Sequence, residues 1–194
     1  MMIFRLIEQL SAWAYRKTSL PIILVLLLAV VVFNLLIFPL HLGVISPDGD
    51  VSILDVRFGY SSDEAYQTLA AMGVEGRAEY LRMLAITDVL YPFVYGTWLI
   101  FAASFFLKRA LRPNSIFRIF NLVALDAILF DLVENVSIIW LIIQFPSENN
   151  AVAWIASTAG ILKWLAVAAA VVVIVLGIVG WVFQSRNDNL RPVE

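Results

Sequence analysis

The sequence predicts an all-α membrane protein built as a bundle of four transmembrane helices. Of its 194 residues, 62% are hydrophobic and 14% are charged, and the mean hydropathy is +0.90. A soluble domain is about half apolar and a quarter charged. The apolar residues also gather in four runs long enough to cross a bilayer core of about 30 Å. These runs are residues 20–40, 84–106, 116–145 and 151–183.

Residues 1–18 are expected to form an amphipathic helix that lies in the membrane interface. Apolar side chains recur at helical spacing, and charged or amide side chains take the opposite face. The apolar positions are Ile3, Leu6, Ile7, Leu10, Trp13 and Ala14. The run 20–40 is too long for the core of a signal peptide and no small-residue cleavage site follows it. We therefore expect a retained helix, with Pro21 in its first turn.

Residues 42–83 are predicted to form an extracytoplasmic cap. SPDGD is typical of a turn, and SILDVRF is apolar enough to lie against the membrane. Ser61 and Glu64 have the spacing of a capping box, and Gly73 can end the short helix that they begin. A second helix is expected to start near Glu75 and to continue directly into the second run.

Lysine and arginine predict the orientation, because they are enriched in cytoplasmic loops. Nine basic residues precede the first run, separate the second run from the third, or follow the fourth. They are Arg5, Arg16, Lys17, Lys108, Arg109, Arg112, Arg118, Arg186 and Arg191. In a four-span protein all of them fall on one side. We therefore expect both termini, including the tail 184–194, in the cytoplasm.

The composition argues against several classes of function. The chain has no cysteine, which removes disulfides, thiol catalysis and cysteine metal sites. A single histidine, His41, argues against a multi-histidine metal site or a bis-histidine haem. A net charge of −2 does not indicate nucleic acid. The sequence contains no HExxH, GxSxG, Walker A or GxGxxG motif. We predict no cofactor and no metal, and the sequence argues against an enzyme without excluding one.

Four polar residues interrupt the third run within LDAILFDLVEN: Asp126, Asp131, Glu134 and Asn135. A charge at the bilayer centre costs about 2.5–3.5 kcal/mol, so these side chains should face protein or water. At 100° per residue they share half of the helix circumference, and Asp131 can hydrogen-bond Asn135 one turn away. Two interpretations stay open: a packing network that fixes helix register, or a functional site.

Lys163, in the fourth run, is the expected partner of these acids. Glu134 is about eleven residues from Phe145, and Lys163 is about twelve from Ala151, so both lie about 17 Å from the outer edge. Antiparallel packing, helped by an AxxxG motif ending at Gly160, would bring the two side chains level. A lysine that extends outward to the interface is the alternative. One lysine neutralises one acid, so the other two must be protonated, share a proton, contact water or bind a cation.

A second polar cluster lies in TDVLYPFVYG. Asp88 is about one turn inside the outer interface, and Pro92 cannot donate to the Asp88 carbonyl four residues earlier. Tyr91 and Tyr95 share one face. The cluster is either a kinked helix with tyrosines in an aromatic belt, or the mouth of a cavity whose floor is formed by Asp131, Glu134 and Lys163.

Arg77 and Tyr80 share a face of the second cap helix and are expected to cover this mouth, where an arginine can pair with Asp88. Solvated charges are the alternative. Asp88 and Asp131 could instead form an aspartyl dyad, as in four-helix lipoprotein signal peptidases, but the Asn and Gly motifs of those enzymes are absent from the sequence. The candidates for ligand binding or proton relay are therefore Asp88, Tyr91, Tyr95, Asp126, Asp131, Glu134, Asn135, Lys163, Arg77 and Tyr80.

The motifs GY, GRxxY, DxxYPxxY and DxxEN, within about residues 55–140, resemble an uncharacterised group of small four-helix bacterial membrane proteins. They correspond to Gly59, Tyr60, Gly76, Arg77, Tyr80, Asp88, Tyr91, Pro92, Tyr95, Asp131, Glu134 and Asn135. The resemblance implies a four-helix architecture, a bacterial inner membrane and the importance of both polar clusters. It implies no activity.

Three functions are compatible with these features. The chain could bind or transport a small polar or lipid-like ligand, coupled or not to protonation, in a cavity open to the outer leaflet. It could be a non-catalytic subunit that docks on a membrane protein partner or on a second copy through its fourth helix, with the polar cluster as structural glue. It could be a lipid-modifying enzyme with a carboxylate as general base. We favour the first function.

Overall fold

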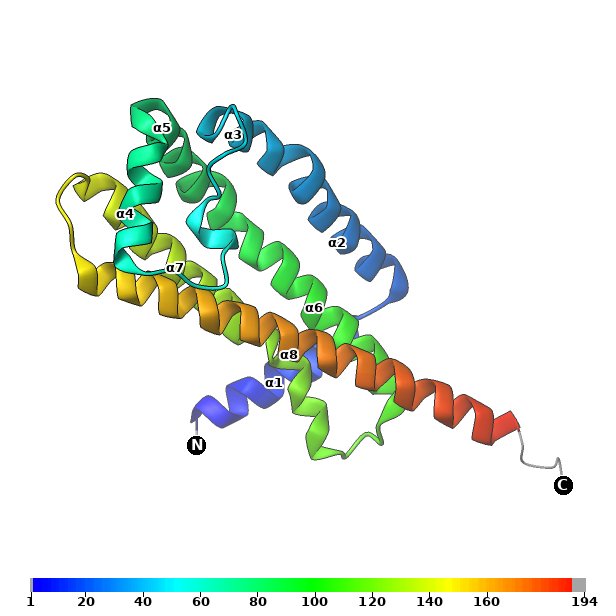
Figure 1. Cartoon of the computed structure of the whole chain (residues 1–194). Helices are drawn as coiled ribbons and strands as arrows, with labels where there is room; N and C mark the ends of the chain where they lie inside the picture. Colours follow the sequence, from blue (N-terminus) through cyan, green and yellow to red (C-terminus); the bar gives the residue numbers. More distant parts are fainter. Residues whose placement is uncertain (1, 190–194) are drawn as a thin grey trace, which may run out of the picture.

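The computed structural model describes residues 2–189, and this part of the chain is helical with no β-strand (Figure 1). The all-α prediction is therefore confirmed. The elements are α1 (Met2–Lys17), α2 (Leu20–Val32), η1 (Phe33–Ile37), α3 (Phe38–Ile45), η2 (Leu54–Val56), α4 (Ser62–Ala71), α5 (Gly73–Arg82), η3 (Met83–Thr87), α6 (Asp88–Ala110), η4 (Ile116–Leu122), α7 (Ala124–Gln144) and α8 (Asn150–Asn189). The short elements η1 and η3 are π-helical turns, and η2 and η4 are 3₁₀ helices.

Three helical stretches of the described residues are long and apolar enough to cross a membrane. They are Leu20–Ile45, Gly73–Ala110 and Asn150–Arg186. They contain the first, second and fourth predicted runs. The third run comprises η4 and α7; α7 is 21 residues long and carries Asp126, Asp131 and Glu134.

The long helices pack around α6. In Figure 1, α6 lies between α2 on one side and α8 on the other, and α8 runs obliquely across α6 and α7. The elements α3, α4 and α5 lie at one end of this assembly, and α1 and η4 lie at the other (Figure 1). One buried apolar cluster joins the α4–α5 end to α7 and α8, and a second joins α6 to its neighbouring helices.

The most extensive helix contact is between α7 and α8, and small residues on α8 allow the close approach. Ala153, Ala156 and Ala159 are buried. A Cβ placed on Gly160 would lie only 2.5 Å from Oε1 of Glu134. Gly160 therefore has the role that the AxxxG motif predicts, because a larger residue would push the two helices apart.

The first predicted run is longer in the structure than in the sequence analysis. The helix does not end at residue 40 but continues through η1 and α3 to Ile45. Pro39 lies in the first turn of α3, and the π-helical turn precedes it. Proline has no N–H to donate to the carbonyl four residues earlier, so a local change in hydrogen bonding lets the helix pass through it.

The third run is interrupted, which corrects the prediction of one helix over 116–145. Its first part is the 3₁₀ helix η4, and α7 begins only at Ala124. The cause is a set of polar contacts with α1. Ser11 donates a hydrogen bond of 2.8 Å to Asn121, whose amide donates to Ser104 of α6. The Tyr15 hydroxyl donates to the main-chain oxygen of Arg118 at 2.7 Å.

The face of α1 that contacts the rest of the chain is thus the side with Ser11, Ala14 and Tyr15. Four large apolar side chains on the described part of α1, those of Leu6, Ile7, Leu10 and Trp13, are exposed. The side chain of Ile3, and Arg191 with the end of the predicted tail, lie outside the described residues.

Helices α4 and α5 begin and end close to where the sequence predicts. Ser61 and Glu64 form a reciprocal capping box at the start of α4. The main-chain N–H and hydroxyl of Ser61 hold the pKa of Glu64 below its usual value. Gly73 has φ +64°, as expected of a residue that ends one helix and starts the next. The chain then runs from α5 through η3 into α6 without a break.

The segment SILDVRF departs from the prediction that it lies against the membrane. It forms η2, and Ile53, Leu54 and Asp55 are buried among the helices. Ser52 at its start and Val56 and Phe58 near its end are exposed. This inserted turn gives the candidate site a residue that sequence analysis did not include.

Candidate functional site

Lys163 of α8 is the centre of the polar cluster. Its Nζ lies 2.6 Å from Oε2 of Glu134, 2.7 Å from the main-chain oxygen of Asp55, and 3.6 Å from Oδ1 of Asp131. Lys163 is 6% exposed and Glu134 is 0% exposed. The contact between Lys163 and Glu134 agrees with the pairing that depth counting on α7 and α8 predicts.

Asp55 is the member of the cluster that the sequence analysis missed. It lies in η2, where its Oδ1 accepts a hydrogen bond of 2.6 Å from the Tyr80 hydroxyl. That hydroxyl also accepts the main-chain N–H of Leu54 at 3.1 Å. The sequence does carry a signal, because Asp55 is a lone acid within the apolar segment SILDVRF.

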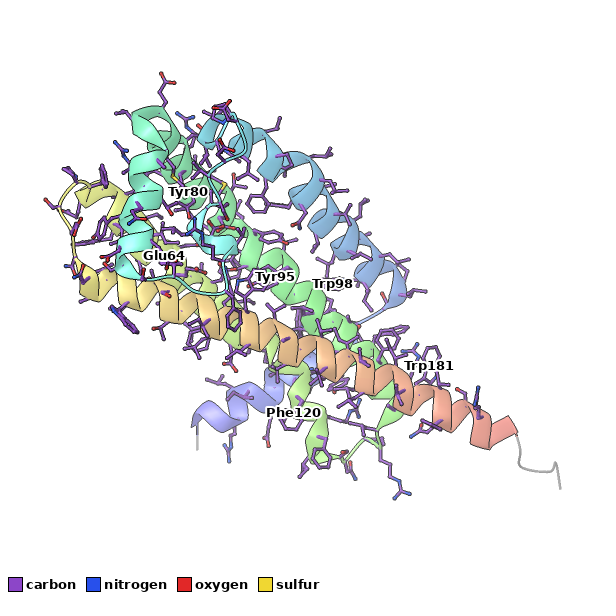
Figure 2. All side chains as sticks on the ribbon, in the orientation of Figure 1. Glu64, Tyr80, Tyr95, Trp98, Phe120 and Trp181 are labelled. Carbon is purple, nitrogen blue, oxygen red and sulfur yellow. The ribbon has the colours of Figure 1, made fainter. Side chains whose placement is uncertain are left out.

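Asp131 of α7 contacts α6 as well as α8. Its Oδ2 accepts a hydrogen bond of 2.8 Å from the Tyr95 hydroxyl. Its Oδ1 is buried and has no hydrogen-bond partner among the described residues. Figure 2 shows Tyr80, Tyr95 and Trp98 at successive positions along the continuous helix from α5 to α6. This helix therefore supplies hydroxyl groups to two of the acids, from Tyr80 to Asp55 and from Tyr95 to Asp131.

Asn135 does not bond to Asp131, which corrects the predicted pair. Its amide instead donates a hydrogen bond of 3.1 Å to the main-chain oxygen of Asp88. This is the carbonyl that Pro92 leaves without a helical partner. The Asn135 amide therefore bonds to a free main-chain acceptor on α6, whereas sequence spacing predicts a bond to Asp131 within α7.

Asp88 lies where η3 passes into α6, and it is 4% exposed. Within residues 2–189 its carboxyl takes part in no ion pair, and the Asn135 amide, which donates to the Asp88 main-chain oxygen, is also the side-chain donor beside this carboxyl. The expected arginine partner is therefore not present. Neighbouring Tyr91 accepts a hydrogen bond of 2.7 Å from Asn34.

Aromatic rings surround Tyr91 on the same side of α6. The ring centroid of Tyr91 lies 5.3 Å from that of Phe33, 5.0 Å from Phe38 and 5.1 Å from Tyr95. Phe33 lies in the π-helical turn η1, and Phe38 lies directly after it. The aromatic group thus joins the α2–α3 helix to α6 beside Asp88.

A cavity of about 370 Å³ lies between the α2–α3 helix, α6 and α8, with η2 at one end. Four ionisable side chains with a formal charge line it: Asp55, Asp88, Asp131 and Lys163. The rest of the lining is mainly apolar or aromatic and consists of Val30, Asn34, Phe38, Leu42, Ile53, Val56, Tyr91, Tyr95, Trp98, Leu99, Trp164, Val167 and Val171. Glu134 does not line the cavity, which corrects the prediction that it forms part of the floor. It lies between α7 and α8, against Gly160.

Three other predicted residues lie away from this cavity. Asp126 is exposed, because α7 begins at Ala124 and places it in the first turn on the outer side. An acid is favourable there, near the positive end of the helix dipole.

Arg77 donates to the Leu69 carbonyl at 2.8 Å and lies over the Phe145 ring. The last carbonyls of a helix have no helical partner, so α4 attracts this arginine. Tyr80 is wholly buried behind Asp55 instead of covering the mouth.

His41 belongs to a separate network. Its Nδ1 lies 2.7 Å from Glu79, which also pairs with Arg82, and its Nε2 lies 2.9 Å from the Thr87 hydroxyl. Residues 2–189 contain no group of three or more His, Asp or Glu side chains placed to hold one metal ion. The chemistry available at the site is therefore that of carboxyl, ammonium, amide and phenol groups.

The fold and site together define an all-helical protein with three helices able to cross a membrane and a buried cluster of carboxylates around one lysine. No family model matches the chain, and comparisons with curated proteins and with solved structures find no significant match.

Proposed function

We propose that the chain is a four-span integral membrane protein that binds a small ligand in the cavity between the α2–α3 helix, α6 and α8. In this proposal α7 is the additional span. Its 21 residues extend about 30 Å at 1.5 Å per residue, which is the thickness of a bilayer core. Asp131 and Glu134 face protein, and Asp126 is close to one end, so each acid has a position that a spanning helix can accept.

The positions of the basic residues support the predicted orientation. The end of α6, the end of α8, η4 and α1 lie together, as shown by hydrogen bonds from Gln184 to Ala110 and from Lys108 to Tyr15. This end carries Lys and Arg residues of all the predicted cytoplasmic segments. We propose that it faces the cytoplasm and that the exposed apolar side of α1 lies in the interface. The α3–α5 end then forms the extracytoplasmic cap. The bacterial inner membrane stays a prediction from the resemblance.

The main support for a binding function is the cavity lined by Asp55, Asp88 and Asp131. Ligand sites are concave, mostly apolar, and carry a few convergent polar groups, with volumes of about 300–1,000 Å³. The cavity of about 370 Å³ has all three properties, and Asp55, Asp88 and Asp131 converge on it. A network with only a structural role has no need of a cavity, since a closed and fully paired cluster is more stable. We therefore favour ligand binding over a purely structural cluster.

Two side chains on α8 allow a test by native mass spectrometry of the purified protein. Val167 lines the cavity, whereas Val175 is exposed on the same helix outside it. We expect wild type to release a bound small molecule or lipid on activation. Val167→Phe should lose this species, because the larger ring fills the cavity, and Val175→Phe should retain it. Equal occupancy in all three proteins, or no bound species in wild type, would contradict the proposal.

A further inference from the structure

We propose that the ligand is an organic cation, an amine or a quaternary ammonium group on an apolar body, with Asp88 as its counter-ion. This inference rests on the proposed function, because it assigns a chemical class to the occupant of the same cavity. It begins from the charges that line the cavity, which are three carboxyls and one ammonium.

Lys163 uses most of its donors within the protein. An ammonium group has three N–H donors. Nζ of Lys163 lies 2.6 Å from Glu134 and 2.7 Å from the Asp55 main-chain oxygen, whereas Asp131 Oδ1, at 3.6 Å, is within ion-pair distance but beyond hydrogen-bond distance. A ligand anion could therefore reach only the third donor, and in the same cavity it would meet the carboxyls of Asp55, Asp88 and Asp131.

Asp88 and Asp131 have the opposite property, because both have acceptor capacity to spare. Asp88 is 4% exposed, and its carboxyl has no ion-pair partner within the described residues; the neutral Asn135 amide is the donor beside it. Oδ1 of Asp131 is buried and without a hydrogen-bond partner in the same part of the chain, and it shares Lys163, 3.6 Å away, with Glu134. A buried acid without a cation of its own is unfavourable unless a ligand cation or a proton balances it. Both groups line the cavity, so an occupant can supply that cation.

Aromatic rings next to Asp88 favour an organic cation. Tyr91, Tyr95 and Trp98 line the cavity from α6, and Phe38 faces them from α3. The faces of such rings attract ammonium groups, most strongly where water is excluded. A carboxylate beside several aromatic rings therefore matches a substituted ammonium group in both charge and polarisability.

The rest of the cavity argues for an apolar body on the ligand and against a bare metal ion. Beside Lys163, its wall toward α8 contains Trp164, Val167 and Val171, and its wall toward the α2–α3 helix includes Val30 and Leu42. Metal ions such as Ca²⁺ or Mg²⁺ need several oxygen ligands together. The described residues offer no such group of three. An amphiphilic amine would instead fill the apolar part of the cavity and place its charge at Asp88.

Three small compounds with one shared body test the inference by isothermal titration calorimetry on the full chain in detergent. They are 3-phenylpropylamine, which is cationic at neutral pH, neutral 3-phenylpropan-1-ol, and anionic 3-phenylpropanoate. We expect the amine to bind at least tenfold more tightly than the alcohol, and the carboxylate to show no binding. Val167→Phe should abolish binding of the amine if the compound occupies this cavity.

Asp88→Asn and Asp126→Asn form the matched pair of variants, because Asp126 is an exposed acid outside the cavity. Asp88→Asn should reduce the preference for the amine to less than twofold, and Asp126→Asn should keep it. The thermal melting of each variant without ligand shows that it is folded, and the comparison of the three compounds on wild type does not depend on any variant.

The two proposals fail in different ways. If the amine and the alcohol bind wild type equally and Val167→Phe removes both, the cavity binds ligands but the cationic class is wrong. If none of the compounds binds although mass spectrometry finds an occupant that Val167→Phe removes, the cationic class is again wrong. If neither experiment finds an occupant, both proposals fail.

Discussion

Lys163 makes the buried carboxyl cluster compatible with an apolar interior. Among the described residues it is the only lysine or arginine within ion-pair distance of Asp131 or Glu134. Removing one partner of a buried pair costs about 3–5 kcal/mol, since the other partner stays buried and charged. We therefore expect Lys163→Met to lower the free energy of unfolding by about 3 kcal/mol at neutral pH. Denaturation in detergent, followed by circular dichroism, measures this change.

A second substitution separates the charge from the shape of the side chain. Glu134→Gln added to Lys163→Met should recover part of the loss, because no charge then remains at Glu134. The loss in Lys163→Met alone should also shrink at low pH, where Glu134 takes up a proton and is no longer a buried charge. If Lys163→Met unfolds at the same denaturant concentration as wild type, the buried pair contributes nothing and the interpretation of the cluster is wrong.

Sequence reasoning locates residues of this cluster where depth along two helices is enough to relate them. Lys163 and Glu134 are correctly paired because helical rise fixes depth and the two helices are consecutive. Asp55 is missed because it lies in a turn, where no periodicity gives its depth. Asn135 is correctly chosen but wrongly partnered, since its acceptor is on another helix.

The same limits apply to whole elements. The continuous helix from Gly73 to Ala110 and the capping box of α4 follow from local rules of helix formation, and both are present. The break before α7 does not follow from such rules, because it depends on contacts with α1 more than a hundred residues earlier, such as Ser11 to Asn121. The prediction that Asp126 belongs to the cluster is wrong for the same reason. Its orientation depends on where α7 starts, and helical spacing alone does not give that start.

The contact between α7 and α8 depends on the absence of a side chain at Gly160. A Cβ there would lie 2.5 Å from Oε1 of Glu134 and 3.1 Å from its Cδ. We expect Gly160→Ala to lower the free energy of unfolding by about 1–3 kcal/mol, the usual cost of an overpacked interior. Thermal melting of the purified protein measures the change.

Gly43 supplies the matched control, because it is also a helical glycine but has no atom within 4 Å of an added Cβ. Gly43→Ala should leave stability unchanged or raise it by up to about 1 kcal/mol through the better helix propensity of alanine. Equal effects of the two substitutions would show that helix propensity alone acts, and that the α7–α8 contact has room at Gly160.

At the scale of the whole molecule, three irregular elements meet around one cavity. Asn34 lies in the π-helical turn η1, Asp88 directly follows the π-helical turn η3, and Asp55 lies in η2. All three residues line the cavity. Irregular turns inside membrane helices are tolerated where the polar groups that they free face protein or a cavity. Three of the four irregular elements of the described residues, all except η4, thus coincide with the place where polar groups are needed.

The topology is open to a direct test, because the chain contains no cysteine and single cysteines can be added without background. Asp48, Asn114 and Glu148 are exposed residues between helices. In a four-span protein whose termini are in the cytoplasm, Asp48→Cys and Glu148→Cys lie outside and Asn114→Cys lies inside. A membrane-impermeant maleimide should therefore label the first two in intact cells, and the third only after permeabilisation.

The decisive comparison is between Asn114→Cys and Glu148→Cys, because only α7 and η4 separate them. If both are labelled from the same side, α7 does not cross the membrane, and the acids on α7 would then lie at a surface instead of within a bundle.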